Sequence, residues 1–543
     1  MSSSSSKLRV DPEIEEDDEE STFEIDTSEL FHSGTFLNNR YIIIVEIGRG
    51  ANAIVYLAYD IKDNSRKSSF YAIKIQNHIS QKGGEKEIAF LEEMRKKVIK
   101  DKLNPDDTHI NHMLDNFKFI DPDNEKHVYY CMVFEVYERS LYPITESGSY
   151  KYGIDIFYVK SIAKQILQGL NFLNHEMGII FTDLKLENIL YCGANQKYVN
   201  IMNNFIHISQ EFMAKVKDIQ SKANNKLSKL STGDDNEALK IKNKYRLSIQ
   251  EVAVEYLNPI VFDYLFNSDN DEEQQGDEEE NEDEENSSSR KKEQKVNKRR
   301  QERNDYQSDL IDKKLINIDK DTVSDFDKKP LNKDKEKNVN YQVITAQQLR
   351  HIYVALTDFG SSIALTSMED RMREISPRFL RAPEVILGLQ FDEKVDVWAF
   401  GTTIFQLITG YELFDTKNTK TNHEDKEHLY TIVKQFGPIP QWMIDESPRK
   451  EYLFDATRNY QIRGLMDFKP YSLKQRLIEQ FRISEDDIDP MWEFLKHVFV
   501  IDPKKRLSVR ELLGHPWLNN SDWLVKFMED RNPKLLDQIN SSR

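Results

Sequence analysis

The residues best suited to chemistry lie in two short segments. Asp183, Lys185 and Asn188 fall close together, and Asp358 begins an Asp-Phe-Gly string much further along the chain. A carboxylate such as Asp183 can orient a hydroxyl group and accept its proton, and Lys185 can neutralise a transferring phosphoryl group. Asn188 and Asp358 offer the oxygen ligands that Mg²⁺ prefers. The pattern predicts phosphoryl transfer from ATP, with Asp183 and Lys185 catalytic and Asn188 and Asp358 binding Mg²⁺.

A second set of residues, nearer the start, could hold the nucleotide. Gly48 and Gly50 lie in a turn between two expected strands, where glycine lets the backbone approach phosphates closely. Lys74 follows one strand later, and Glu87 on the next expected helix is its natural ion-pair partner, with Glu85 as the alternative in register. The residues expected to contact ATP are Ile47, Gly48, Gly50, Val55, Ala72, Lys74, Glu87, Glu135, Tyr137 and Leu190.

Two kinds of periodicity indicate which elements position these groups. Residues 41–59, 70–75 and 129–136 are rich in β-branched and aromatic side chains, which favours strands. Residues 85–99 and 159–173 carry apolar side chains at helical spacing. This order predicts a small β-rich lobe followed by a helical lobe. We expect a leader at 1–40, a first lobe at 41–138, a second lobe at 139–192 and 351–525, a spacer at 193–350 and a tail at 526–543.

The expected spacer separates two segments that should form one hairpin. Residues 198–264 are moderately periodic and predict one or two helices. The acidic run 269–286 contains 12 Asp or Glu residues, and the basic run 290–303 contains eight Lys or Arg residues. The spacer as a whole, 193–350, is expected to be mostly disordered, and the basic run is interpreted as a nuclear import signal or as a solvated linker. A hairpin loop tolerates such an insertion because closure entropy grows only logarithmically with length.

Composition excludes several classes of protein. The formal net charge of −18 argues against general nucleic-acid binding, which needs a basic face. Two cysteines are too few for a disulfide framework or a zinc site, and they favour a reducing compartment. No apolar run is long enough to span a membrane, and the Ser-rich start lacks the apolar stretch of a signal peptide. We expect a protein of the cytoplasm and nucleus.

With these strings in this order, the chain resembles the SR-protein kinases, within the larger group that includes the cyclin-dependent, MAP and Clk kinases. The resemblance covers roughly residues 41–192 and 351–520. It rests on the strings at 131–136, 165–170, 182–185, 427–429 and 515–518, on Arg381 before Ala382-Pro383-Glu384, and on the large spacer. It implies an α+β, two-lobed protein kinase fold, Ser/Thr specificity, Mg²⁺ and ATP as cofactors, and a monomer acting on Arg/Ser-rich splicing proteins.

The resemblance also implies structural partners and reveals departures. Glu384 should pair with Arg506, and Asp396 should brace the backbone of the catalytic loop. Phe181 stands where a histidine is usual, and an aromatic ring there could still fill the apolar column beneath the site. Thr182 replaces the arginine that in many kinases grips a phosphorylated activation loop. The segment 361–376 is therefore expected to be ordered by packing, without an activating kinase.

Two further departures concern transfer and substrate choice. Pro377 occupies the place of a threonine that usually contacts the catalytic Asp and Lys, and Ser376 is adjacent but displaced by one position. The family docks arginine-rich peptides in an acidic groove. Glu427 matches one docking position, whereas Tyr411 and Lys434 replace two others, with Glu412 and Asp425 nearby in the sequence. Two alternatives stay open: a kinase of the same group with another basic or proline-directed substrate, and a catalytically weak kinase-fold scaffold.

Overall fold

The computed structural model describes residues 30–62, 69–121, 124, 126–146, 150–192, 196–230, 234–266, 349, 351–414, 424–463, 470–483 and 485–519. The acidic run 269–286 and the basic run 290–303 lie outside the described residues. The chain forms two compact units: the first comprises residues 1–102, 111–136 and 206–258, and the second comprises the remainder.

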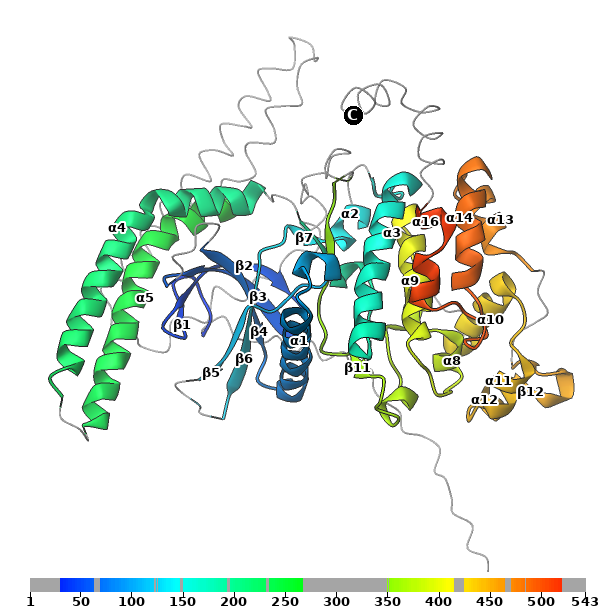
Figure 1. Ribbon diagram of the computed structural model, residues 1–543, viewed down its shortest axis with the longest axis horizontal. Helices are drawn as coiled ribbons and strands as arrows, with labels where there is room; N and C mark the ends of the chain where they lie inside the picture. The colour runs from blue at the N-terminus through cyan, green and yellow to red at the C-terminus, as the bar shows by residue number, and fades with distance from the viewer. Residues whose placement is uncertain are drawn as a thin grey trace, which may run out of the picture. The chain divides into compact units, whose positions relative to one another are not determined.

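The first unit is built on a six-stranded antiparallel sheet of order β1-β2-β3-β4-β6-β5 (Figure 1). Its strands are β1 (Phe36–Leu37), β2 (Tyr41–Arg49), β3 (Ala53–Asp60), β4 (Phe70–Gln76), β5 (Asp115–Ile120) and β6 (Val128–Phe134). The expected strands are present, because β-branched and aromatic side chains pack well on a pleated surface. The turn at Gly50 joins β2 to β3, and Asn77 directly follows β4.

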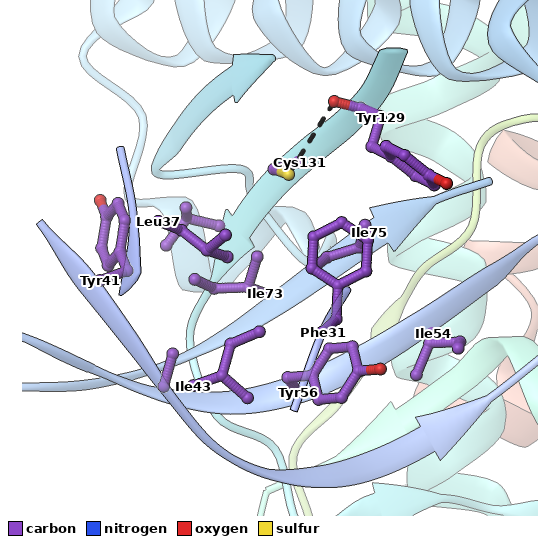
Figure 2. Close-up of a cluster of buried hydrophobic side chains, with 12 residues drawn as sticks. Phe31, Leu37, Tyr41, Ile43, Ile54, Tyr56, Ile73, Ile75, Tyr129 and Cys131 are labelled. Atoms are coloured by element: carbon purple, nitrogen blue, oxygen red, sulfur yellow. Dashed lines mark hydrogen bonds between the residues drawn. The ribbon is translucent and has the colours of Figure 1, made fainter. Parts of the chain in front are cut away.

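The two faces of this sheet carry different side chains. One face holds a buried cluster that includes Tyr41, Ile43, Tyr56, Ile73 and Ile75 (Figure 2). Side chains alternate between faces along a strand, so Val55, Ala72 and Lys74 lie on the opposite face. Lys74 is the cross-strand partner of Val55, which confirms that these two residues share a face. The apolar cluster thereby anchors the strands that carry the expected nucleotide-binding residues.

Helix α1 (Gln81–Asp101) follows β4 and buries Leu91, Met94 and Val98 against the sheet. Glycines at the helix start allow close packing: a Cβ atom on Gly84 would lie 3.2 Å from the side chain of Gln76 and 3.3 Å from that of Tyr130. The helix ends at Lys102, whose φ of 53° is the left-handed conformation common at helix C-termini. The helix predicted over 85–99 is present and longer than expected.

Helices α4 (Gln196–Leu227) and α5 (Asp235–Phe266) belong to the expected spacer and lie side by side (Figure 1). Within the first unit, Phe212 packs on Tyr256 at 5.8 Å between ring centroids, and Gln220 donates a hydrogen bond to the Tyr245 hydroxyl. The ring of Tyr245 also contacts Phe36 of β1 at 6.0 Å. This part of the spacer is therefore folded onto the sheet of the first unit.

The second unit is mostly helical. Its longer helices are α3 (Ile156–Asn171), α9 (Lys394–Thr409), α10 (Glu424–Phe436), α13 (Leu473–Glu479) and α14 (Glu485–Val498). Shorter helices are α2 (Tyr142–Glu146), α8 (Pro383–Ile386), α11 (Gln441–Glu446), α12 (Lys450–Leu453), α15 (Val509–Leu513) and α16 (Pro516–Asn519). A π-helical turn, Phe172–Met177, continues α3, and 3₁₀ turns span Pro105–Thr108, Leu186–Asn188, Asp370–Met372, Arg378–Leu380 and Ala456–Arg458.

Helix α9 is the core of this unit, because every residue from Val395 to Thr409 is buried. A helix that is apolar on all sides must be surrounded by protein. Trp398 on α9 packs edge-on against Phe499 at 5.4 Å, and Gly401 lies so close to Val498 and Phe499 that a Cβ atom would meet them at under 3 Å. None of the described helices is long and apolar enough to cross a membrane.

Three small antiparallel sheets complete the second unit. Strands β7 (Arg139–Ser140), β9 (Ile189–Tyr191) and β10 (Val354–Leu356) form one sheet of order β10-β9-β7. Strand β8 (Ile179–Ile180) pairs with β11 (Ile363–Ala364), and β12 (Phe454–Asp455) pairs with β13 (Gln461–Ile462). Ala355 is the partner of Leu190, so the segments on either side of the spacer form the expected hairpin.

The close approach of Gly153 to the end of α9 gives a test of the fold. Gly153 has a φ of 105°, and a Cβ atom there would lie 1.8 Å from the Ile408 carbonyl oxygen. We expect Gly153→Ala to lower the free energy of unfolding by about 3 kcal/mol or more, as measured by denaturant unfolding. Gly178→Ala is the matched control: its φ is 64° but no atom lies within 4 Å, so about 1 kcal/mol is expected. Equal losses of unfolding free energy in the two variants would contradict the close packing of Gly153 against the end of α9.

The fully buried His428 on α10 predicts sensitivity to acid. Burial lowers the pKa of His428 from 6.5 to about 3, and neither ring nitrogen has a hydrogen-bond partner in the part of the chain that the structure describes. Nearby Asp425 raises the pKa, whereas Arg378 and Arg381 lower it. Below pH 6.5 the unfolded chain binds a proton that the folded chain does not, so acid favours unfolding.

The free energy of unfolding should therefore fall by up to about 1.4 kcal/mol for each pH unit as pH drops from ~6.5 toward ~4. We expect His428→Leu, which keeps the apolar contact with Phe414, to reduce this slope in pH-dependent denaturant unfolding. The exposed His351→Leu is the matched control. An unchanged slope in His428→Leu would contradict the prediction.

Candidate active site

The catalytic segment lies between β8 and β9 of the second unit. The Asp183 Oδ2 atom accepts hydrogen bonds from Asn188 Nδ2 at 2.8 Å and from Lys185 Nζ at 2.9 Å. The Asp183 Oδ1 atom is buried and has no hydrogen-bond partner among the described residues. One carboxylate oxygen is thus held by two neighbours, and the other is left to accept a proton. The structure brings Asp183, Lys185 and Asn188 together as the sequence predicts.

A buried carboxylate on α9 holds the backbone just before Asp183. Asp396 accepts hydrogen bonds from the backbone amides of Phe181 and Thr182, each at 2.8 Å, and from Asn174 Nδ2 at 3.0 Å. Burial raises the pKa of Asp396 to about 6, while these three donors lower it. The predicted brace is confirmed. Asn174 is a partner that the sequence did not indicate, because only the π-helical turn brings it beside Asp396.

Three residues around the catalytic segment adopt a left-handed backbone. The φ angles are 68° for Thr182, 67° for Asp358 and 64° for Ser376. Such angles cost on the order of 1–3 kcal/mol for residues other than glycine, and they persist where the surroundings impose them. Hydrogen bonds do so here: Thr182 Oγ1 donates to the Ser361 carbonyl at 3.0 Å, and Ser376 Oγ donates to the Thr182 carbonyl. The strain marks a segment held in one conformation.

Asp358, the second expected Mg²⁺ ligand, directly follows the β10 region and is exposed. The neighbouring Phe359 is buried and packs against Phe181 at 5.4 Å between ring centroids. The aromatic ring of Phe181 therefore fills the apolar column as expected. The oxygen atoms of Asn188 and Asp358 suit Mg²⁺, which binds one or two protein carboxyl or amide oxygens together with phosphates. Among the described residues, no group of three His, Cys, Asp or Glu side chains could hold a metal by itself.

The ion pair expected for the first unit is present. Lys74 Nζ contacts Glu87 Oε1 at 2.7 Å and Oε2 at 2.8 Å, and Glu87 is almost fully buried. Glu85, the alternative partner in register, instead accepts a hydrogen bond from Tyr130 and is exposed. A low-dielectric setting strengthens such a pair and keeps the ammonium group in one position. The structure thus selects Glu87.

The remaining nucleotide candidates lie on strands or turns of their own unit. Gly48 pairs with Val55 across β2 and β3, and the Gly50 amide donates to the Ala53 carbonyl at 2.9 Å, which closes the turn. Ile47 is half-buried at the end of β2, and Ala72 is buried on β4. Glu135 follows β6 in the first unit, whereas Tyr137 and Leu190 belong to the second unit.

The predicted ion pair of Glu384 with Arg506 in the second unit is also confirmed. Arg506 contacts both carboxylate oxygens of Glu384, at 2.7 Å and 3.0 Å, and both residues are buried. Thr403 on α9 donates a hydrogen bond to the Leu184 carbonyl at 3.0 Å, an anchor of the catalytic segment that the sequence did not reveal. A threonine inside an apolar helix run gives no signal by which such a role could be recognised.

The acidic residues at the start of α10 form ion pairs with arginines of the same unit. Asp425 lies between Arg378 and Arg449, with contacts of 2.6 Å to each. Glu424 also contacts Arg378, at 2.8 Å. The charge of Asp425 is therefore neutralised within the fold, so this residue is not an additional acidic docking group. Tyr411 is exposed, and its ring lies 5.8 Å from that of Phe481.

Comparison with known proteins agrees with this geometry. The protein kinase domain model matches residues 41–208 and 335–518. The protein L205 of Acanthamoeba polyphaga mimivirus, whose name describes a serine/threonine-protein kinase, is 32% identical over 94% of this chain and 92% of its own length. Protein kinase dsk1 of Schizosaccharomyces pombe is 25% identical over 89% of this chain and 81% of its own length. Human SRSF protein kinase 3 is 24% identical over 90% of this chain and 87% of its own length.

These matches confirm the two-lobed kinase fold and the resemblance stated above. The match to the kinase domain is in two segments, and it is interrupted by the spacer. Relatives named as SR-protein kinases span most of the chain. The chain belongs to the protein kinase family, as a serine/threonine protein kinase of the SR-protein kinase type.

Proposed function

We propose that this kinase transfers the γ-phosphoryl group of Mg²⁺-bound ATP to serine residues of Arg/Ser-rich proteins. The observation that carries the proposal is the arrangement at Asp183, where Oδ2 is held by Lys185 and Asn188 and no described residue hydrogen-bonds the buried Oδ1. A serine hydroxyl that donates to Oδ1 would satisfy this buried oxygen and would be oriented for attack.

Each residue then has a separate task. Asp183 accepts the proton of the attacking hydroxyl, and Lys185 compensates the charge that develops on the transferring group. Asn188 and Asp358 would hold Mg²⁺, which supplies charge neutralisation at the phosphates. Lys74, held by Glu87, is positioned to contact the α- and β-phosphates. Because phosphoryl transfer needs orientation and charge compensation more than covalent chemistry, these groups suffice.

The proposed substrate class rests on relatives and on Glu427 of α10. Human SRSF protein kinase 3 and the SRPK of Physarum polycephalum match most of the chain. Lys434, at the last turn of α10, has the wrong sign for an arginine partner. A different basic or proline-directed substrate is therefore the second candidate.

Peptide phosphorylation tests both candidates. We expect transfer of radiolabelled phosphate to favour an Arg-Ser repeat peptide over a control peptide with Arg-Ala-Ser spacing. Asp183→Asn should lower kcat by about 10³-fold, because general-base catalysis contributes 10²–10⁴-fold. Asp445→Asn on the exposed surface of α11 is the matched control and should retain activity. Transfer to the control peptide alone would reject the Arg/Ser assignment, and no transfer to either would favour the scaffold.

The activation segment is proposed to need no phosphate. Its contacts with the catalytic segment are neutral hydrogen bonds, which include those from Thr182 to Ser361 and from Ser362 to the Phe181 carbonyl at 3.3 Å. Arg371 Nε also donates to the Phe391 carbonyl at 2.6 Å. These contacts support a segment ordered by packing, since Thr182 offers no positive charge to a phosphate.

The triple variant Ser361→Ala/Thr366→Ala/Ser367→Ala should keep kcat/KM within about twofold of the unmodified enzyme, since its side chains are not required as phosphate carriers. Ser376→Ala should instead lower kcat about tenfold, because its hydroxyl holds the Thr182 carbonyl beside Asp183. Steady-state kinetics, with intact-mass measurement to establish the phosphorylation state, checks both. Loss of activity after phosphatase treatment of the unmodified enzyme would contradict the proposal.

A further inference from the structure

Three polar residues with no role assigned so far, Asn52, Asn77 and Ser80, connect the glycine turn to helix α1. The Asn77 backbone amide donates to the Asn52 carbonyl oxygen at 2.9 Å. The Ser80 amide donates to Asn77 Oδ1 at 2.7 Å, and the Ser80 hydroxyl donates to Asn52 Oδ1 at 3.0 Å. The three bonds close a ring, which we call the Asn52–Asn77–Ser80 ring. It joins the turn between β2 and β3, the end of β4 and the start of α1.

The side chain of Ser80 has an unusual partner for its position. Ser80 is the N-cap residue of α1, where a serine oxygen normally accepts a hydrogen bond from an amide of the first helical turn and contributes about 1 kcal/mol. Ser80 makes no such capping bond. Its hydroxyl instead contacts Asn52, at the tip of the glycine turn. The helix start therefore lacks its usual cap, and the turn gains a side-chain anchor.

The strand pairing of the sheet also continues into the turn. Ala53, the first residue of β3 after the turn, is buried and pairs with Gln76 on β4. The bond from Asn77 to Asn52 continues this ladder by one residue into the turn. Glycine at position 53 would leave the tip more conformational freedom. The alanine and the ring together restrict a segment that in the proposed function contacts phosphates.

The ring adjoins the same two elements that carry the Lys74–Glu87 ion pair, β4 and α1. Lys74 is three residues before Asn77, and Glu87 is seven residues, about two helical turns, after Ser80. The elements that carry the ion pair are thus the elements that the ring connects. Restraining the turn before nucleotide binds reduces the ordering that binding would otherwise require.

We propose that Asn52 and Ser80 are positioning residues that hold the glycine turn in its nucleotide-binding conformation, and this inference rests on the proposed use of ATP. Neither residue takes part in the transfer step. Loss of the Asn52–Ser80 bond should therefore raise the KM for ATP more than it lowers kcat. A residue with only a structural role would instead lower thermal stability and kcat together.

The test is a double-mutant cycle on the full chain, with Mg-ATP as the varied substrate. We expect Asn52→Ala and Ser80→Ala each to raise the KM for ATP about threefold, the gain from one modest hydrogen bond, with kcat changed by less than twofold. Because both changes remove the same bond, the double variant should also show about a threefold increase. Ser80→Thr retains the hydroxyl donor and should restore the KM. A ninefold increase in the KM for ATP in the double variant, or an unchanged KM in the single variants, would overturn the inference.

Hydrogen exchange on the nucleotide-free chain separates this inference from the proposed function. The Asn77 amide and the amides of residues 50–53 should exchange faster in Asn52→Ala and Ser80→Ala, and Ser80→Thr should match the unmodified chain. Unchanged exchange would overturn the ring as a restraint, whether or not the enzyme uses ATP. An unmodified chain that neither binds nor turns over ATP, but shows the expected exchange differences, would reject the proposed function and leave the restraint supported.

Discussion

The buried carboxylate of Asp396 is the constraint on which the catalytic segment depends. It lies in the first turn of α9, where every residue from Val395 to Thr409 is buried, and it accepts bonds from two consecutive backbone amides, those of Phe181 and Thr182. An unpaired buried amide would cost about 1–3 kcal/mol, so the backbone is held where these acceptors are. Thr182 is thereby kept at a φ of 68°, and Asp183 follows in a fixed direction. The backbone conformation that positions Asp183 thus depends on a side chain of α9.

In the first unit, apolar packing positions the candidate nucleotide-binding residues. An apolar cluster covers one face of its sheet (Figure 2). Val55, Ala72 and Lys74 lie on the other face. Packing on the first face determines the register of the strands, since a shift of one residue would exchange the faces. The position of Lys74 therefore follows from apolar burial, and its ion pair with Glu87 adds the orientation.

The fold tolerates the long spacer because the spacer begins and ends at two neighbouring strands, β9 and β10. Leu190 and Ala355 are direct partners in an antiparallel pair, although many residues separate them in the chain. The cost of closing so long a loop grows slowly with length. Part of the spacer also contributes to the fold, as Tyr245 of α5 packs on Phe36 and Val254 lies against Gly34.

The sequence by itself determined the chemical groups and their order, because these depend on residue type and spacing along the chain. Asp183, Lys185, Asn188, Asp358 and Lys74 were all predicted as candidate site residues in this way, and the periodic helices and strands were predicted from their spacing. Only the tertiary structure chose Glu87 over Glu85, since that choice depends on which helix face meets the sheet. Only the tertiary structure shows that two arginines contact the Asp425 carboxylate and that the Ser80 hydroxyl contacts Asn52. Hydrogen bonds and ion pairs act over a few ångströms in space, so partners distant in the chain leave no pattern in a single sequence.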